Sequence, residues 1–383
     1  MLKSAGYIVV AAVASFVTFG LCMNPEQSAI GKKLTQLENV ILERFIGNTN
    51  KTALEDGAAA GMVAATGDRW SYYISAEEYE SYVNRMENAY VGIGVTITNL
   101  EDGTGMEIKK VSPGTGAEEA GLLMGDIIVA VDGKSVKETG LKQAQNMIRG
   151  EENTQVQITV LRGEETIEVS VTRRTVQVEV AAGTMLPGEI ALVTIYNFDS
   201  RCAEETIGQV ERMIAQGAKG IIFDVRNNPG GYRHELVKVL DYLLPEGDLF
   251  RSVDYQGVES VDTSDENCVK MPMVVLMNEE SYSAAEFFAA ALQEYDWAVT
   301  VGNPTVGKGY FQSLVKLSDG SAVSLSMGKY FTPNGISLAE VGGLTPDILV
   351  ELTDEQKAAV LAGTLDPNED PQIQAALKHL KNG

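Results

Sequence analysis

The chain has 383 residues, enough for two domains and an additional anchor segment. Its hydrophobic content of 44% and charged content of 22% are ordinary for a folded globular protein. Thirty Lys and Arg residues stand against 53 Asp and Glu residues, and the resulting net charge of −23 argues against nucleic acid as the main partner. The acidic balance indicates a soluble surface, with a preference for basic substrates as the alternative interpretation.

The first 25 residues are predicted to form a membrane signal-anchor. Residues 4–25 contain no charged side chain and Lys3 precedes them, and roughly 20 apolar residues are needed to span a bilayer. A cleaved signal peptide is the alternative, but no clear small-x-small site ends the apolar run. Because few positive charges precede the span, we expect the chain that follows it to be exported.

Residues 26–88 are predicted to be a helical region. Apolar residues recur there at helical spacing, at Ile30, Leu34, Leu37, Ile41 and Phe45. Packing against a core is the main interpretation of this pattern, and a contact within a homodimer is the alternative. The segment from Ser75 to Tyr79 indicates a second, capped helix start.

Residues 89–174 resemble a PDZ domain. The segment Y-V-G-I-G-V at 90–95 is similar to the carboxylate-binding loop of such domains, and residues 112–122 and 125–133 are similar to their central motif. The resemblance implies that the backbone of Gly92, Ile93, Gly94 and Val95 receives the terminal carboxylate of a peptide, which adds as a strand to the sheet edge. Residues 141–148 would form the helix beside that groove.

Residues 175–365 are predicted to form an α/β core. Apolar strands are expected at 190–195, 221–225, 273–277 and 298–301, with a helix over 203–216. Strands that alternate with helices indicate an α/β core. A helical tail is expected at 366–383. The chain as a whole is therefore predicted to be a multidomain α+β/α/β protein with an anchor, a helical segment, a PDZ domain and an α/β core.

Two short segments of this core carry candidate chemistry. They are S-Y-S-A-A-E at 281–286 and V-G-K-G-Y-F-Q at 306–312. A serine hydroxyl needs a base to take its proton, and the chain has only two histidines, His234 and His379. A lysine can serve instead when its surroundings keep the amine neutral.

These segments resemble those of the C-terminal processing peptidases, tail-specific serine proteases of family S41 that carry a PDZ domain. The resemblance implies that Ser283 is the nucleophile, Lys308 the general base and Gln312 the group that orients the lysine. Tyr282, Ala285 and Val306 depart from the family pattern, and none of these departures removes a reacting group.

An oxyanion hole is expected beside Ser283. The Ala284 amide at a helix N-terminus can be one donor. The turn N-N-P-G-G at 227–231 resembles the family loop that supplies the second donor, either Gly230 or Gly231. Taken alone, such a turn is more often a plain strand ending.

The resemblance implies an endopeptidase that cleaves proteins near free C-termini through an acyl-enzyme, with no metal or cofactor. Its catalytic part is expected to be anchored outside the cytoplasm of a bacterial cell, or secreted if the signal is cleaved. A non-catalytic PDZ adaptor on a peptidase-like fold is the alternative. Such a protein would be expected to have lost Ser283 or Lys308, and both residues are present. The G-x-x-x-x-G-K match at 302–308 lacks the Ser or Thr of a nucleotide-binding loop.

Three further features of the sequence are two cysteines, two Ser-x-x-Lys matches and a short C-terminal segment. Cys202 and Cys268 could form a disulfide in an oxidising compartment, and two unpaired cysteines are an equal alternative. Ser-x-x-Lys occurs at 313–316 and 326–329, where no helix is expected to start, so neither match indicates a penicillin-binding site. The segment D-P-Q at 370–372 also resembles a family segment, without an indicated role.

Overall fold

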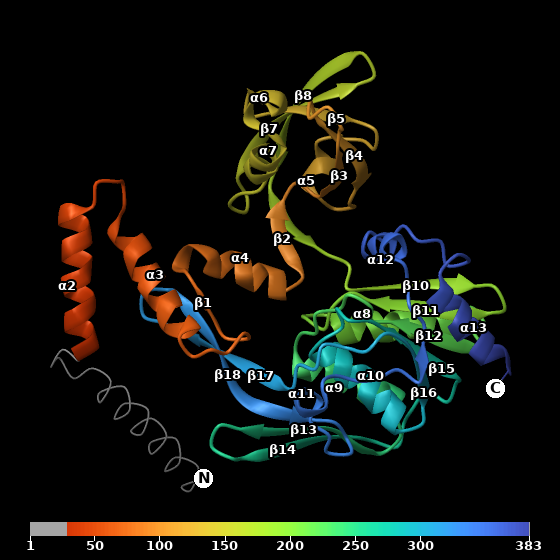
Figure 1. Ribbon diagram of the computed structural model, residues 1–383. Helices are drawn as coiled ribbons and strands as arrows, with labels where there is room; N and C mark the ends of the chain where they lie inside the picture. Colours follow the sequence, from red (N-terminus) through yellow and green to blue (C-terminus); the bar gives the residue numbers. More distant parts are fainter. Residues whose placement is uncertain (1–28, 383) are drawn as a thin grey trace, which may run out of the picture. The chain divides into compact units, whose positions relative to one another are not determined.

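The computed structural model describes residues 29–382 (Figure 1). The anchor predicted at 1–25 lies outside these residues. Over the range 29–382, the structure contains no helix that is both long and apolar enough to cross a membrane. The described residues divide into two compact units, one of residues 29–76 with 314–325 and the other of residues 77–313 with 326–382.

The first unit contains two helices and a short strand. Helix α2 (Ala29–Arg44) confirms the helix predicted from the apolar spacing, and α3 (Lys51–Ala64) follows it. Strand β1 (Tyr72–Ile74) pairs antiparallel with residues 322–324 at the start of β18 (Ala322–Phe331). The Tyr73 hydroxyl donates to Asp56 at 2.7 Å and so ties β1 to α3.

The second unit begins with α4 (Ala76–Met86) and includes the predicted PDZ domain. An antiparallel pair, β2 (Ala89–Gly92) and β9 (Arg174–Gln177), leads into and out of this domain. Its sheet has the order β3 (Val95–Asn99), β4 (Met106–Val111), β5 (Ile127–Val131), β7 (Gln155–Arg162) and β8 (Glu165–Thr172). The smaller elements are α5 (Gly116–Glu119), β6 (Lys134–Ser135), α6 (Val136–Thr139) and α7 (Leu141–Ile148). Helix α7 confirms the helix predicted at 141–148, and its place beside a peptide groove stays a prediction.

The predicted α/β core contains a six-stranded sheet. Its order is β10 (Ala181–Leu186), β11 (Ile190–Ile195), β12 (Gly220–Asp224), β15 (Met273–Met277), β16 (Ala298–Gly302) and β19 (Ile348–Leu349). The strands from β11 to β19 are parallel, and β10 pairs antiparallel with β11. Four of these strands were predicted, because parallel strands covered on both faces appear in a sequence as continuous apolar runs.

Helices cover both faces of this sheet (Figure 1). Helices α8 (Cys202–Ala215), α9 (Arg233–Leu243) and α10 (Ala284–Glu294) share one core with the inward side chains of Ile221 and Phe223. Helix α13 (Pro371–Asn382) packs on the opposite face with Ile222. The segment expected to be a helical tail therefore forms a helix that covers one face of the sheet.

The remaining elements lie beside this sheet and after it. Strands β13 (Gly247–Asp254) and β14 (Glu259–Ser264) form a hairpin, and β13 also pairs with residues 328–331 of β18. Strand β17 (Tyr310–Lys316) pairs with β18. Helices α11 (Leu338–Val341) and α12 (Asp354–Leu361) lie between β18 and α13 in the chain.

The predicted catalytic segments all follow carboxyl ends of parallel strands. The turn at 227–231 follows β12, the segment at 281–286 follows β15, and the loop with Lys308 follows β16. In parallel sheets these ends meet at one edge, which is where binding sites are usually built. The topology therefore gathers the three segments at a common edge.

Candidate active site

Ser283 lies at the turn between β15 and α10. Its φ of 56° and ψ of −126° lie outside the regions that most non-glycine residues occupy. Such strained backbone persists only where surrounding contacts hold it, and it concentrates at functional sites. Ser283 is 7% exposed and precedes a helix end whose first N–H groups lack intrahelical acceptors. That position favours negative charge.

Gly230 approaches the serine turn, whereas Gly231 packs elsewhere. A Cβ atom added at Gly230 would lie 2.7 Å from Ser283 Cβ and 2.8 Å from the Ala284 nitrogen. A Cβ atom added at Gly231 would lie 2.3 Å from the Phe198 carbonyl carbon. The φ of 87° at Gly230 also favours glycine. Of the two candidate oxyanion glycines, Gly230 is therefore the one beside Ser283 and Ala284.

Asparagine side chains fix the loop that carries Gly230. The Gly230 N–H donates to Asn228 Oδ1 at 2.8 Å, and the Asn228 amide donates to the Ile195 carbonyl at 2.8 Å. The Asn227 N–H donates to Asn278 Oδ1 at 2.9 Å, and the Asn278 amide donates back to Asn227 Oδ1 at 3.0 Å. An oxyanion would therefore have to share the Gly230 N–H with Asn228 or displace that side chain.

The buried carboxylate of Glu286 joins the serine turn to the lysine loop. Its Oε2 accepts from the backbone nitrogens of Ser283 and Lys308, both at 2.9 Å. Its Oε1 accepts from Thr305 Oγ1 at 2.5 Å and from the Gly307 nitrogen at 2.6 Å. Burial raises the pKa of this carboxyl, and the four hydrogen bonds act against that rise. One side chain thus positions both segments.

The sequence did not indicate this role. Glu286 belongs to the recognised segment at 281–286, but its partners in the lysine loop lie 19 to 22 residues further along the chain. The only local signal is its place three residues after Ser283, where a capping Glu is common at helix starts.

Lys308 is partly buried on the loop after β16. Its ammonium nitrogen lies 5.7 Å from the centroid of the Tyr282 ring, a cation–π geometry with the residue that precedes Ser283. The structure therefore brings the lysine to the immediate neighbour of the serine.

Gln312 lies on β17, downstream of the lysine. Its amide nitrogen donates to Ser326 Oγ at 2.9 Å and to the Tyr310 carbonyl at 3.2 Å. These bonds hold the side chain between β17 and β18. The role of Gln312 in orienting Lys308 stays a prediction.

The predicted carboxylate-binding loop of the PDZ domain, residues 92–95, lies between β2 and β3. Gly94 has a φ of 86°, and a Cβ atom there would lie 2.3 Å from Thr115 Cβ. Its carbonyl accepts from the Ser112 N–H at 2.9 Å. Gly94 is thus required by the packing of the domain itself, so its replacement would not test peptide binding alone.

The loop at 196–201 is hydrogen-bonded to the Gly230 loop. The Phe198 N–H donates to the Gly230 carbonyl at 2.7 Å, and the Tyr232 N–H donates to the Phe198 carbonyl at 2.8 Å. Asp199 follows Phe198 in this loop. Burial raises the pKa of the Asp199 carboxyl to about 7, with Arg85 opposing the rise and Glu87 adding to it.

Asp199→Asn is expected to stabilise the protein more at high pH than at low pH. The folded protein holds the Asp199 proton up to about pH 7, whereas the unfolded chain loses it near ~3.9. Stability is therefore lost as the pH rises through this window and is constant above it. Urea unfolding at about pH 4 and about pH 8 measures the difference between the variant and the wild type. A difference that does not change with pH would contradict the assignment.

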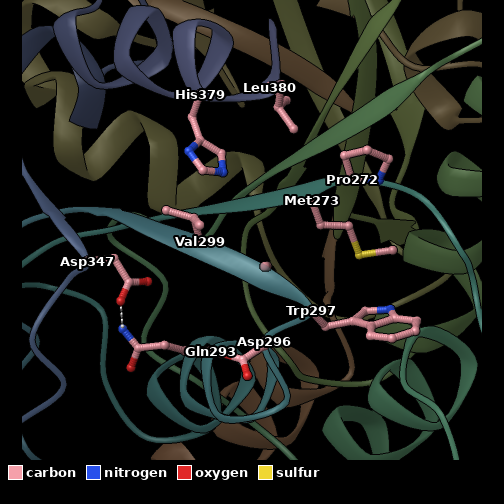
Figure 2. Close-up of a pocket in the computed structure, with 10 residues that line it drawn as sticks. Pro272, Met273, Gln293, Asp296, Trp297, Val299, Asp347, His379 and Leu380 are labelled. Atoms are coloured by element: carbon pink, nitrogen blue, oxygen red, sulfur yellow. Dashed lines mark hydrogen bonds between the residues drawn. The ribbon is translucent and has the colours of Figure 1, made fainter. Parts of the chain in front are cut away.

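A cavity of about 450 Å³ lies at the opposite edge of the sheet (Figure 2). Met273 and Ala298, which line it, begin β15 and β16. Asp347 and Gln293 also line the cavity and are joined by a 3.0 Å hydrogen bond, with His379 from α13 above them. Because the candidate catalytic segments follow the carboxyl ends of these strands, the cavity is separate from them.

The other residues singled out in the sequence have ordinary surroundings. His234 is exposed, stacks on Tyr232 with ring centroids 5.1 Å apart, and lies 3.4 Å from Glu235. Cys202 is buried, Cys268 is partly buried, and both are free thiols. The open question of pairing is thus answered for these two cysteines.

Comparison with known proteins finds matches to both the PDZ region and the α/β core. The model of peptidase family S41 matches residues 189–350, and a PDZ domain model matches residues 107–162. The chain is 32% identical over 364 residues to the carboxy-terminal processing protease CtpA of Bacillus subtilis (strain 168), covering 92% of this chain and 77% of that protein. It is 30% identical over 372 residues to a probable CtpA-like serine protease of Staphylococcus aureus (strain MRSA252), covering 94% and 74%.

A solved structure shows the same fold. The putative S41 protease from Bacteroides fragilis NCTC 9343 superposes with a TM-score of 0.54 at 17% identity, covering 91% of this chain and 97% of that one. The CtpA relatives match almost the whole chain, and the S41 match includes the sheet edge with Ser283 and Lys308. The chain therefore belongs to the carboxy-terminal processing proteases of peptidase family S41, which are serine proteases.

Proposed function

We propose that this protein is a serine endopeptidase that cleaves protein substrates at or near their C-termini, with Ser283 as nucleophile and Lys308 as general base. The observation that carries the proposal is the position of the Glu286 carboxylate. This side chain, in the first turn of α10, accepts hydrogen bonds from the backbone nitrogens of both Ser283 and Lys308. Burial of Ser283 and the ring of Tyr282 against Lys308 support it further.

The reaction passes through an acyl-enzyme. The neutral Lys308 amine takes the hydroxyl proton of Ser283 while Oγ attacks the scissile carbonyl carbon. The tetrahedral intermediate collapses, the C–N bond breaks, and the Lys308 ammonium returns the proton to the leaving amine. A water molecule, deprotonated by Lys308, then attacks the carbonyl carbon of the ester. The second tetrahedral intermediate collapses, the C–Oγ bond breaks, and the Lys308 ammonium returns its proton to Ser283 Oγ as the acid is released. In this scheme Gln312 orients the lysine amine.

The oxyanion of each tetrahedral intermediate is stabilised by backbone N–H groups. The Ala284 N–H, first in helix α10, is one donor, and the Gly230 N–H is the other. The close approach of Gly230 to both Ser283 and Ala284 supports this choice over Gly231. Each such donor typically contributes about 2.7–4 kcal/mol to transition-state stabilisation.

The PDZ domain supplies the preference for free C-termini in this proposal. Strand β3 ends the order of the domain's sheet, so its outer edge is available for an added peptide strand. The loop at 92–95 directly precedes it and would receive the carboxylate. Substrates are accordingly proteins or peptides with free C-termini.

We also propose where the protein acts. The uncharged segment at 4–25 supports anchoring in a bacterial membrane with the catalytic part outside the cytoplasm, or secretion if the segment is cleaved. A homodimer is a further proposal, supported by exposed apolar side chains along α2, namely Ile30, Leu37, Val40 and Leu42.

Product mapping tests the proposed function. A denatured protein with a free C-terminus is incubated with the wild type and with Ser283→Ala, and the fragments are identified by mass spectrometry. We expect the wild type to cut near the substrate's C-terminus and release short C-terminal fragments. These fragments should be absent with Ser283→Ala. Cleavage spread evenly along the substrate would contradict the C-terminal preference, and cleavage by Ser283→Ala would contradict the nucleophile.

Binding of a peptide tail tests the role of the PDZ domain. A peptide with a free, apolar C-terminus should bind Ser283→Ala protein much more tightly than the same peptide amidated, because charge-assisted hydrogen bonds to a carboxylate contribute about 1.5–3 kcal/mol each before offsets. Calorimetric titration of both peptides into the full chain measures the difference. Equal affinities would mean that the domain does not recognise C-termini.

A further inference from the structure

The segment D-P-Q at 370–372 has two buried polar side chains that hydrogen-bond to residues next to the candidate active site. Asp370 is 1% exposed and Gln372 is not exposed at all. The segment begins α13, the helix on the far face of the sheet, and turns its polar side chains toward the strand ends. Buried polar side chains are costly unless they are paired, so their partners indicate what they hold.

One partner is Arg226, which directly precedes the Gly230 loop. Its guanidinium forms two hydrogen bonds to the Asp224 carboxylate, at 2.9 and 2.7 Å. Its Nη1 donates to Asp370 Oδ2 at 2.8 Å and to Gln372 Oε1 at 2.9 Å. Burial alone would lower the pKa of Arg226, but the two carboxylates outweigh it and raise the pKa, so the guanidinium stays charged.

The other partners belong to the lysine loop and the strand beside it. The Gln372 amide nitrogen donates to Asn303 Oδ1 at 3.2 Å and to the Val350 carbonyl at 2.8 Å. Asn303 is the first residue after β16, and its N–H donates to the Met277 carbonyl at 3.1 Å. Gln372 therefore bonds to the start of the lysine loop, at Asn303, whereas Glu286 accepts hydrogen bonds from its other end, at Gly307 and Lys308.

Only a carboxamide can make this set of bonds. Gln372 accepts from a guanidinium through its oxygen and donates to two oxygens through its nitrogen. A carboxylate could accept from Arg226 but could not donate, and an ammonium could donate but could not accept. An apolar side chain would leave the Val350 carbonyl without this donor.

We propose that Gln372 is a positioning residue that fixes the distance between the oxyanion loop, through Arg226, and the lysine loop, through Asn303. This proposal rests on the proposed roles of Ser283, Lys308 and Gly230. It adds that the two loops are held in register by the C-terminal layer of the fold, on the face of the sheet opposite α10.

The test compares Gln372→Met with two controls on the same helix. Methionine keeps the volume of the side chain and removes its hydrogen bonds. Gln374→Ala changes the same residue type where the side chain is exposed and donates to the Pro367 carbonyl. Leu377→Ala removes apolar packing between α13 and the sheet without touching the hydrogen bonds. Thermal unfolding and hydrolysis of a short peptide that bypasses the PDZ domain are measured for each.

Gln372→Met should lower kcat by about 10- to 100-fold with little change in KM, since small displacements of catalytic groups have effects of this size. Its rate–pH profile should also change shape, because the base would sit in a looser environment. Leu377→Ala should lower the melting temperature at least as much while kcat per folded molecule and the pH profile stay unchanged. Gln374→Ala should resemble the wild type.

A loss of kcat in Gln372→Met no larger than in Leu377→Ala, with an unaltered pH profile, would overturn the proposal and leave the Ser283 assignment standing. If Gln372→Met does not fold, Asn303→Ala breaks only the lysine-loop end of the bridge. That variant should show the same loss of kcat and the same change in the pH profile, and wild-type kinetics in it would overturn the proposal. Activity in Ser283→Ala would instead contradict the proposed function.

Discussion

Lys308→Ala is expected to abolish proteolysis to the same extent as Ser283→Ala, and the double variant should be no worse than either single one. The two residues act as one unit in the proposed mechanism, so the second substitution removes nothing that still functions. Losses of about 10⁴-fold or more in kcat/KM are expected for members of such units. Hydrolysis of a chromogenic peptide measures all three variants.

Lys378→Ala is the matched control, because Lys378 is an exposed lysine on α13. It should keep wild-type kinetics. Substantial activity in Lys308→Ala, or multiplied losses in the double variant, would mean that Ser283 and Lys308 do not act together. A metal chelator should leave the wild-type rate unchanged, since no step of the mechanism uses a metal ion.

Glu286→Gln is expected to reduce both stability and activity strongly. Glutamine keeps the size of the side chain but replaces one accepting oxygen by an NH₂ group. Each Glu286 oxygen accepts two donors, so two buried donors would face a group that cannot accept. At about 1–3 kcal/mol for each unsatisfied donor, the free energy of unfolding should fall by about 2–6 kcal/mol. Urea unfolding measures this change.

The activity of the folded fraction should also fall, because the serine turn and the lysine loop lose their common anchor. Glu280→Gln, an exposed substitution in the preceding loop, should change neither quantity. Wild-type kinetics in Glu286→Gln would mean that the carboxylate does not position the two segments, whatever its effect on stability.

Local patterns allowed much of the fold to be predicted. The strands at 190–195 and 273–277 and the helix at 141–148 have the predicted bounds, because apolar runs and helical spacing are properties of neighbouring residues. The motifs at 281–286 and 306–312 follow strands that could be recognised in the sequence, and both lie after the carboxyl ends of parallel strands.

Contacts between distant segments could not be predicted. The sequence left Gly230 and Gly231 equivalent, because both tolerate positive φ and only packing against Ser283 distinguishes them. It offered no role for Glu286 or Gln372, whose partners lie on other loops. It set residues 366–383 apart as a tail, because an amphipathic helix at the end of a chain does not reveal which surface it covers.

Trapping the acyl-enzyme tests the central claim most directly. The wild type is mixed with a peptide ester, quenched with acid during turnover, and digested for mass spectrometry. We expect the acyl group on the fragment that contains Ser283, and no adduct in Ser283→Ala. An adduct on another residue, or turnover of the ester by Ser283→Ala at the wild-type rate, would contradict the assignment of Ser283 as the nucleophile.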